Sequence, residues 1–369
     1  MIINVAVIKG DGVGPEMMEP ALEVLEAVCR LYDHELKILP VIASGESIDT
    51  SGNPMPDESL KTCMEASAVL LGNTGLAKYR SYPLEQRPEF ALRKLRKGME
   101  VTTNIRPVHI YPELTDFSPL KERKISKGVD FVFVRDIVGG VLCSDNVKAE
   151  GKFGKEAYEL EYYNEMQIRD TAAIAFGIAE KRRNKLMNLD KSNVLESSRL
   201  WRNIVIETSK FYPEVALSHC YIDTLAMKII DAPDEFDVLL TTNLFGDIIS
   251  DEGTQITGTP YLYASAEISK SGRGIYTPNQ LHNPDESIIG KQIVNPIGMI
   301  AATALMLRYS FRLDEEASRI ENAIEMAIIS GARTRDIAAE DEQWLSTDQM
   351  GGRIIELLEY NALKRVTAN

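Results

Sequence analysis

The chain has 369 residues, of which 26% are charged, and its formal net charge is −14. A chain of this length exceeds one ordinary compact core, so two domains are predicted. The acidic balance disfavours nucleic acid and anionic membrane surfaces as partners, because both carry negative charge. An anionic substrate would therefore need a local cluster of basic side chains.

The cysteines and the apolar segments predict a cytoplasmic protein. The four cysteines form neither a CxxC pair nor a zinc spacing, which is typical of reduced thiols. They are Cys29, Cys63, Cys143 and Cys220. Residues 1–9 show no basic leader or cleavage site and predict a buried first strand. The longest apolar stretch, Pro296–Leu307, is too short to span a bilayer.

Short apolar runs alternate with periodic segments along the chain. Strands are predicted at residues 5–8, 68–72, 129–134 and 236–241, and helices at 16–32, 165–183 and 201–211. This alternation predicts an α/β protein with a largely parallel sheet. Residues 151–163 interrupt the rhythm and predict an extended arm or a hairpin. The last hundred residues are helical in pattern.

A glycine-rich segment, Gly10-Asp-Gly-Val-Gly-Pro15, follows the first predicted strand. It is not the dinucleotide fingerprint GxGxxG, because the third glycine comes one residue early and a proline follows. A tight turn that lines some pocket is the favoured interpretation.

Two carboxylates lie one helical turn apart in Asn243-Leu-Phe-Gly-Asp247-Ile-Ile-Ser-Asp251. If this segment opens a helix, Asp247 and Asp251 share one face and could bind Mg²⁺ or Mn²⁺, which prefer oxygen ligands. The alternative is a pair of acids that complements the helix dipole. Asp223, before another helical stretch, is a third candidate ligand.

Three arginines and one lysine are the candidates for binding an anionic substrate. Arg96, Arg106 and Arg135 lie near the ends of predicted elements, and guanidinium groups bind carboxylates in a bidentate manner. Lys191, near a bound cation, could act as a general base. Surface salt bridges and a solvated lysine are the alternatives for these residues.

Taken together, the segments resemble the isocitrate/isopropylmalate dehydrogenase family, and its isopropylmalate branch in particular. The resemblance runs from Val5 to about Phe311. The matching segments, in family order, are Gly10-Asp-Gly-Val-Gly-Pro-Glu16, Asn104-Ile-Arg106-Pro107, Ser118-Pro-Leu-Lys121, Gly139-Gly140, Asp190-Lys191-Ser-Asn-Val-Leu-Glu196, Tyr221-Ile-Asp223, Asn243-Leu-Phe-Gly-Asp247 and Asn295-Pro296.

The resemblance implies an α/β fold with two domains and a large mixed sheet that is not a Rossmann fold. Residues 1–105 with 258–369 would form a discontinuous cofactor-binding domain, and residues 106–257 a central domain with the dimer interface. The implied protein is a homodimer whose active sites lie between domains and are completed by the partner subunit.

The resemblance also implies a role for each candidate residue. Arg96, Arg106 and Arg135 would hold the substrate carboxylates. Asp247 and Asp251, with Asp223 from the partner, would hold Mg²⁺ or Mn²⁺. Lys191, also from the partner, would assist deprotonation of the C2 hydroxyl while NAD takes the hydride. The resulting β-keto acid loses CO2, because the cation stabilises the enolate.

Three departures from the family pattern concern the site. Leu142 stands where the family places a proton-donating tyrosine, so water, Cys143 or Ser144 is expected to replace it, or the last proton transfer to be slow. The adenosine-binding loop is altered around His282 and Asp285, which are expected, with Asn295, to bind NAD. One turn before Arg96, Leu92 suits an alkyl substituent of the substrate, whereas Arg93 suits a polar one or faces solvent.

The predicted function is NAD- and metal-dependent oxidative decarboxylation of a 2-hydroxy dicarboxylic acid. 3-Isopropylmalate is the leading substrate, and malate, tartrate and homoisocitrate stay open. The competing hypothesis is a catalytically weak, ligand-binding or regulatory paralogue, which Leu142 and the altered loop favour. The retained lysine, aspartates and arginines favour the enzyme.

Overall fold

A computed structural model describes residues 1–144, 147–279, 281–282 and 285–366, and the chain divides into two compact units. Unit 1 comprises Met1–Val101 and Thr259–Asn369, and unit 2 comprises Thr102–Gly258. The first division lies four residues before the predicted boundary at 105. The reason is local: β4 (Thr103–His109) pairs along its whole length with β5 (Asp130–Asp136), a strand of unit 2.

Among the described residues, ten strands form the main mixed sheet, and five belong to each unit. The strands of unit 1 are β1 (Ile2–Ile8), β2 (Glu35–Pro40), β3 (Ala68–Leu71), β11 (Ala264–Ile268) and β12 (Gly274–Pro278). Their order is β2-β1-β3-β12-β11, and only the β11–β12 pair is antiparallel. The prediction that the last hundred residues are helical is wrong at β12, which is a short, fully buried strand.

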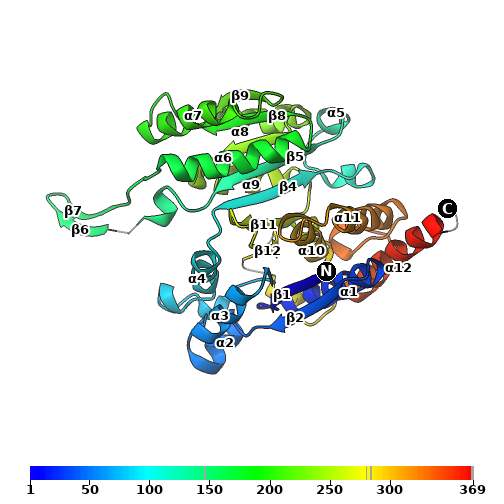
Figure 1. Cartoon of the computed structure of the whole chain (residues 1–369). Coiled ribbons are helices and arrows are strands. Elements are labelled where there is room, and N and C mark those ends of the chain that lie inside the picture. The colour runs from blue at the N-terminus through cyan, green and yellow to red at the C-terminus, as the bar shows by residue number, and fades with distance from the viewer. Residues whose placement is uncertain (145–146, 280, 283–284, 367–369) are drawn as a thin grey trace. The chain divides into compact units, whose positions relative to one another are not determined.

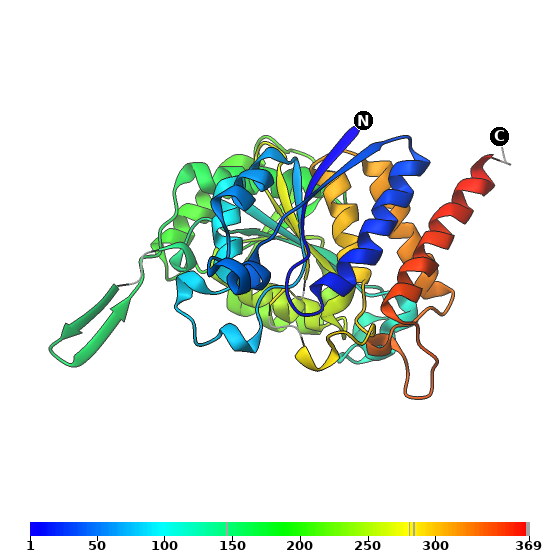
Figure 2. The ribbon, with the colours of Figure 1, turned by 90° about the horizontal axis from the view of Figure 1, so that it is seen from below.

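The helices of unit 1 include a layer in which α1, α10, α11 and α12 lie side by side (Figure 1, Figure 2). Helix α10 is apolar on nearly all sides, and α1, α11 and the strands β11 and β12 cover it. The helices are α1 (Gly14–Leu31), α2 (Ser44–Ser51), α3 (Asp57–Glu65), α4 (Glu89–Met99), α10 (Ile297–Tyr309), α11 (Asp314–Ile329) and α12 (Thr347–Val366).

Unit 2 contains the strands that carry most of the candidate site. They are β4 (Thr103–His109), β5 (Asp130–Asp136), β8 (Lys185–Asp190), β9 (Ala216–Tyr221) and β10 (Val238–Thr241). Their order is β4-β5-β10-β8-β9; β4 and β5 are antiparallel, and the following pairs are parallel. The parallel strands β5, β10, β8 and β9 therefore end at one edge of the sheet.

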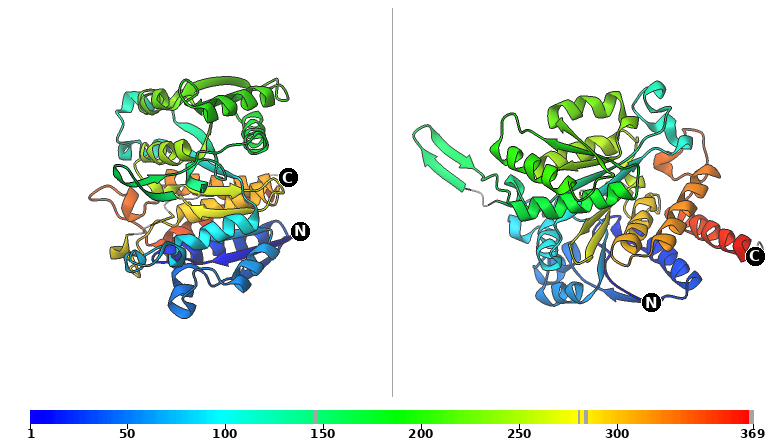
Figure 3. Two further views of the ribbon diagram at one scale, coloured as in Figure 1. Left: turned by 90° about the vertical axis from the view of Figure 1, so that its left-hand side faces the viewer. Right: turned by 45° about the horizontal axis from the view of Figure 1, so that its top comes forward.

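The helices of unit 2 are α5 (Glu122–Ile125), α6 (Glu165–Glu180), α7 (Glu196–Ser209), α8 (Ile222–Asp231) and α9 (Asn243–Gln255). Between β5 and α6 lies a hairpin, β6 (Val147–Gly151) with β7 (Gly154–Tyr158), which extends away from the rest of unit 2 (Figure 3). The predicted arm or hairpin is thus a hairpin, and it begins four residues earlier than expected.

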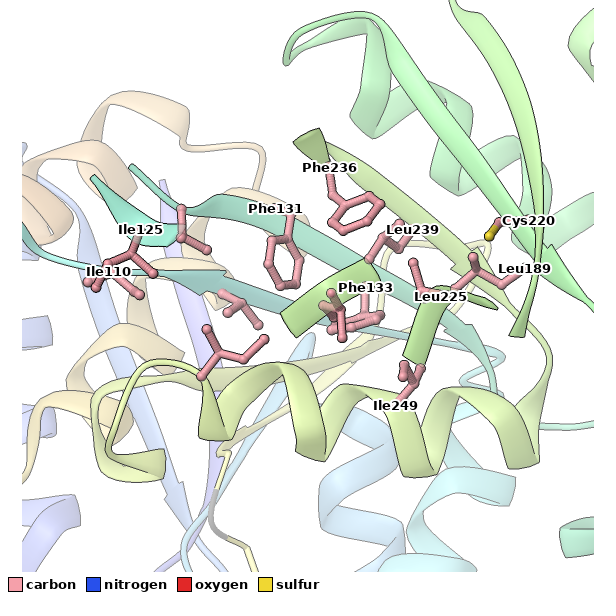
Figure 4. Packing of buried hydrophobic residues seen from close by; sticks show 14 residues of the cluster. Ile110, Ile125, Phe131, Phe133, Leu189, Cys220, Leu225, Phe236, Leu239 and Ile249 are labelled. Carbon is pink, nitrogen blue, oxygen red and sulfur yellow. The ribbon is translucent and has the colours of Figure 1, made fainter. Parts of the chain in front are cut away.

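The core of unit 2 fixes the position of α9. Phe131 and Phe133 of β5 pack edge to face, with ring centroids 5.4 Å apart, and Ile249 of α9 belongs to the same cluster (Figure 4). A Cβ on Gly253 would lie 2.6 Å from the Phe133 ring, so a glycine is needed where α9 crosses β5 this closely. With Ile249 and Gly253 against the sheet, Asp247 and Asp251 are left on a more exposed face.

The predicted fold class is confirmed: the chain is α/β, has a large mixed sheet, and lacks the all-parallel pattern of a Rossmann fold. None of the helices in the described ranges is both long and apolar enough to cross a membrane.

Candidate active site

The candidate residues of unit 2 gather where its parallel strands end. In the strand register Arg135 lies opposite Thr241, and Asp190 lies opposite Tyr221. Lys191 directly follows β8, while Asp223 lies in the first turn of α8, directly after β9. In open α/β sheets this carboxyl edge is the usual place for a ligand, because loops and helix N-termini converge there.

Arg135 is a buried guanidinium held between two residues of α9. Its Nε and Nη2 atoms donate to Asn243 Oδ1 at 3.0 and 2.7 Å, and its Nη1 atom forms an ion pair with Asp247. Asn243 in turn donates from Nδ2 to the Gly139 carbonyl at 2.9 Å. This network fixes the plane of the guanidinium, while the Asp247 side chain remains 48% exposed.

Arg106 of β4 reaches the next turn of α9. Its Nη1 atom donates to Ser250 Oγ at 2.8 Å and to Asp251 Oδ1 at 2.7 Å. Its Nε atom is buried and has no acceptor among the described residues. Because a buried N–H without an acceptor is costly, a ligand oxygen at this position would be favoured. The Asp251 carboxylate is 74% exposed and has room for a further ligand.

Lys191 and Asp223 form an ion pair with Nζ and Oδ2 2.9 Å apart. The hydrogen bond from Lys191 lowers the pKa of Asp223, so this carboxyl is ionised at neutral pH. Lys191 Nζ also lies 5.9 Å from the centroid of the Tyr221 ring, within the range of a cation–π contact. The proposed base and one proposed metal ligand are therefore neighbours within one chain.

A buried network supports the backbone at Lys191. Asp190 has no exposed side-chain surface and receives two hydrogen bonds from Arg202, at 2.8 and 2.9 Å. Asp190 Oδ1 also accepts from the Ser192 amide at 2.9 Å, and the Lys191 amide donates to Ser198 Oγ at 3.2 Å. The start of α7 is thereby fixed to the end of β8, which holds Lys191 in place.

In unit 1, Arg96 is paired with Glu267, a residue that was not among the predicted site residues. Arg96 Nε donates to Glu267 Oε2 at 2.8 Å, and Nη2 donates to Oε1 of the same carboxylate. Glu267, in β11, is only 5% exposed. On the same helix as Arg96, Leu92 is buried and Arg93 is exposed, so Arg93 turns to solvent.

The predicted NAD-binding residues all belong to unit 1. His282 Nδ1 lies 2.8 Å from Thr74 Oγ1, which ties the loop to the end of β3. Asp285 is exposed, and the hydrogen bonds that it accepts from Ser287 lower its pKa. Asn295 is buried; its Oδ1 accepts from the Ile297 amide at 3.0 Å, and its Nδ2 donates to Asp336 at 3.2 Å. Asn295 thus supports the start of α10.

The position of the missing tyrosine is on the surface of unit 2. Leu142 is 48% exposed and lies in a short turn, Val141–Cys143. Cys143 donates from Sγ to the Ile137 carbonyl, and Asn243 Nδ2 lies 3.4 Å from the same sulfur. Ser144 donates to the Val141 carbonyl. Of the two side chains that, besides water, were expected to replace the tyrosine, Cys143 is the one linked to the residues around Arg135.

The described part of one chain brings no three Asp, Glu, His or Cys side chains together as a possible metal site. Asp247 and Asp251 lie together on α9, while Asp223 is paired with Lys191. The donor set itself suits Mg²⁺ or Mn²⁺, because these ions prefer carboxylate oxygens and a carboxylate can accept an arginine and a cation together.

Two residues that organise the site, Asn243 and Tyr163, were not assigned a role from the sequence. Asn243, four residues before Asp247, has a position on the α9 face that could have revealed it. Tyr163 is buried against Gly139 and Gly140, and its hydroxyl accepts from the Asn243 amide at 2.9 Å. Tyr163 lies between the hairpin and α6, where no sequence pattern marks it. Its contact with Gly139 and Gly140 depends on the path of the loop after β5.

Comparison with known proteins agrees with this fold. Residues 4–354 match the family model described as isocitrate/isopropylmalate dehydrogenase. The 3-isopropylmalate dehydrogenase of Clostridium acetobutylicum is 42% identical over 352 residues, covering 95% of this chain and 98% of that protein. The 3-isopropylmalate dehydrogenase of Thermotoga maritima is 42% identical over 358 residues, covering 97% and 99%.

Solved structures give the same result. An isocitrate dehydrogenase from Methylococcus capsulatus superposes with a TM-score of 0.81 at 27% identity, covering 96% of this chain and 98% of that one. A β-decarboxylating dehydrogenase from Thermococcus kodakarensis, in its apo form, gives 0.78 at 27% identity, covering 96% of each chain.

The chain belongs to the isocitrate/isopropylmalate dehydrogenase family, an oxidoreductase family. Within it, the chain is an enzyme similar to the 3-isopropylmalate dehydrogenases over their full length. The resemblance inferred from the sequence motifs is thereby confirmed.

Proposed function

We propose that the chain catalyses the NAD- and divalent-metal-dependent oxidative decarboxylation of a 2-hydroxy dicarboxylate of the 3-isopropylmalate type. The observation that carries this proposal is the set of pairs Arg106–Asp251, Arg135–Asp247 and Lys191–Asp223 in unit 2. It combines groups that bind carboxylates, groups that bind a hard cation, and an amine that accepts a proton.

Arg106 and Arg135 are assigned to the substrate carboxylates. Arg106 has a buried Nε without an acceptor in the described residues, and the plane of Arg135 is set by Asn243. A substrate carboxylate at Arg106 would satisfy that N–H and form a charge-assisted hydrogen bond. We assign Arg96 the same role; its bidentate contact with Glu267 orients its guanidinium in advance.

Asp247 and Asp251, with Asp223 of a second subunit, are assigned to Mg²⁺ or Mn²⁺. A cation held by these carboxylates would polarise the C2 oxygen and stabilise the negative charge that develops as CO2 leaves. The partial exposure of all three aspartates supports this assignment, since their oxygens are accessible to a ligand from outside the chain.

Lys191 is assigned to the proton of the C2 hydroxyl. In its neutral form, the Lys191 amine would receive that proton while C2 gives its hydride to NAD. Its position is set by Asp190 and Ser198 through the backbone and by Asp223 through the ion pair. Transfer of the last proton, after CO2 has left, is assigned to water or to Cys143, because Leu142 cannot donate.

A homodimer that shares its sites is part of the proposal. Met227 and Ile230 of α8 and Ile248 of α9 are apolar and largely exposed, close in sequence to the three aspartates. Burial of such a surface against a second copy would be favourable and would bring Asp223 of one chain toward another. Phe153, at the tip of the β6–β7 hairpin and 91% exposed, is a second apolar group for such contact.

We further propose NAD, in preference to NADP, and a cytoplasmic location. An exposed, ionised Asp285 would repel a 2′-phosphate on the ribose. The four cysteines are present as thiols, which is typical of a reducing compartment.

The test is a substrate panel. The purified protein, with NAD and Mn²⁺, is given 3-isopropylmalate, malate, tartrate, homoisocitrate and isocitrate, and both NADH and CO2 are measured. Equal yields of NADH and CO2 with one of these acids, abolished by a chelator, are expected. NADH without CO2 would point to a simple dehydrogenase, and neither product with any acid would favour the non-catalytic paralogue.

A further inference from the structure

The glycine-rich segment Gly10–Glu16 has no role in the proposed chemistry, yet both of its carboxylates accept hydrogen bonds from backbone N–H groups. Asp11 lies just before α1, and Glu16 lies in the first turn of this helix. A Cβ on Gly10 would lie 2.2 Å from the Asn73 carbonyl oxygen, so only glycine lets these two backbones approach so closely. The Asp11 amide donates to the same oxygen at 2.6 Å.

Glu16 holds the far end of the predicted NAD-binding loop. Its Oε1 atom accepts from the Gly290 amide, and its Oε2 atom accepts from the Gln292 amide at 2.9 Å. Gly290 and Gln292 both have positive φ, +74° and +55°. For a residue other than glycine this conformation is unfavourable, so Gln292 needs the surrounding contacts that hold it there.

Asp11 is linked indirectly to the other end of the same loop, around residues 281–282. The link runs through Gly75, which Asp11 binds, and through its neighbour Thr74, which contacts the loop. The Oδ2 atom of Asp11 accepts from the Gly75 amide at 2.8 Å, and its carboxylate also binds Ser44 Oγ and the Gly45 amide. The neighbouring Thr74 donates its amide to the Leu281 carbonyl at 2.8 Å and contacts His282 through its hydroxyl. Asp11 is buried, and its carboxylate accepts three hydrogen bonds from the described residues.

The charge of these groups excludes the usual role of a glycine loop. Dinucleotide loops bind pyrophosphate with free backbone N–H groups at a helix N-terminus. Here two carboxylates lie at that turn, where they would repel a phosphate. The amides from which they accept are those of Gly45, Gly75, Gly290 and Gln292, and the last three belong to the loop segments around residues 75 and 290–292.

We propose that Asp11 and Glu16 are positioning residues for the cofactor: together they clamp the loop that carries His282 and Asp285 at both ends. This inference rests on the proposed use of NAD. Glu16 is the better residue to test, because it is partly exposed and binds only the loop in the contacts described here, whereas Asp11 is buried and joins three segments.

The experiment compares Glu16→Gln with Glu19→Gln in the full-length protein. Glu19 lies one turn further along α1, is exposed and pairs with Lys9 at the surface. Glu16→Gln keeps one acceptor but presents an NH2 group to the other amide, so one hydrogen bond is lost. Hydrogen exchange without cofactor should become about tenfold faster in a peptide covering residues 288–293, because loss of one hydrogen bond costs about 1.4 kcal/mol, which corresponds to a factor of ten. Glu19→Gln should leave it unchanged.

The kinetic part links the clamp to the cofactor. Glu16→Gln should raise the KM for NAD about tenfold, while kcat and the melting temperature stay near those of Glu19→Gln. A merely structural role would lower kcat and the melting temperature together. Equal exchange in the two variants, or an unchanged KM for NAD, would overturn the inference. The proposed function is tested separately, by fluorescence titration of the unmodified protein with NADH, and it fails if NADH does not bind. The hydrogen-exchange comparison would still show whether Glu16 holds the loop.

Discussion

Asp136, the last residue of β5, should make the stability of the protein depend on pH. Its side chain is fully buried beside Arg135, and burial raises its pKa from 3.8 to about 6, against the opposing hydrogen bonds from Gly139, Val138 and Thr171. A raised pKa in the folded state means that folding favours the protonated carboxyl. Its stabilising contribution is therefore complete below pH 3.8 and is lost as the pH rises through about 6.

The magnitude follows from the two pKa values, 3.8 unfolded and about 6 folded. The loss is on the order of 1–2 kcal/mol at pH 5 and approaches about 3 kcal/mol at pH 7.5. Asp136→Asn removes the titration but keeps the geometry, because Oδ1 accepts from both the Val138 and Gly139 amides, and Thr171 can accept from the new NH2 group.

The assay is urea unfolding of both proteins at pH 5 and pH 7.5, at one fixed protein concentration. Relative to the unmodified protein, Asp136→Asn should gain on the order of 1–2 kcal/mol of unfolding free energy between pH 5 and pH 7.5. Asp341→Asn, at an exposed site, is the control and should show no such gain. If the unfolding free energies of Asp136→Asn and the unmodified protein differ by the same amount at pH 5 and at pH 7.5, that result refutes the reasoning.

Three further outcomes are expected. Lys191→Met should lower kcat by about 10²–10⁴-fold in steady-state NADH assays, with little effect on folding; an unchanged kcat would remove its assigned role. Phe133→Ala should lower the unfolding free energy by roughly 3–5 kcal/mol in urea, because Phe133 is buried in the core of unit 2, whereas the exposed Phe153→Ala should have little effect. Leu142→Tyr should speed the final proton transfer, measured as a higher turnover; no gain would show that the missing tyrosine does not limit the rate.

The fold was predictable where the sequence has a clear period. The run Val5–Ile8 and the segment after it became β1 and α1, because an apolar run and a 3.6-residue period each specify one element. Strand β4 was not predicted, since Thr103–His109 contains Arg106 and Pro107 and becomes a strand only by pairing with β5. Likewise, no local pattern marks β12 as a strand, because its burial depends on α10 and β3.

In the site, the sequence indicated residue types and helix faces but not partners. Asp247 and Asp251 share a face of α9 as their spacing predicts. That Arg106 pairs with Asp251, 145 residues away, depends on β4 lying antiparallel beside β5. Glu267 could not be predicted for the same reason. A single acidic residue in an apolar strand carries no local pattern, and its role follows only from the fold, which places Arg96 beside it.

The central claim, that each active site combines Lys191 and Asp223 of one subunit with Asp247 and Asp251 of another, is tested most directly by subunit complementation. Lys191→Met and Asp247→Asn are each purified as inactive proteins, mixed, dissociated and reassociated, and NADH formation is measured with the best acid of the panel. Random pairing gives half mixed dimers, each with one intact site, so activity should recover to about one quarter of that of the unmodified protein. No recovery, with mixed dimers demonstrably formed, would contradict the account.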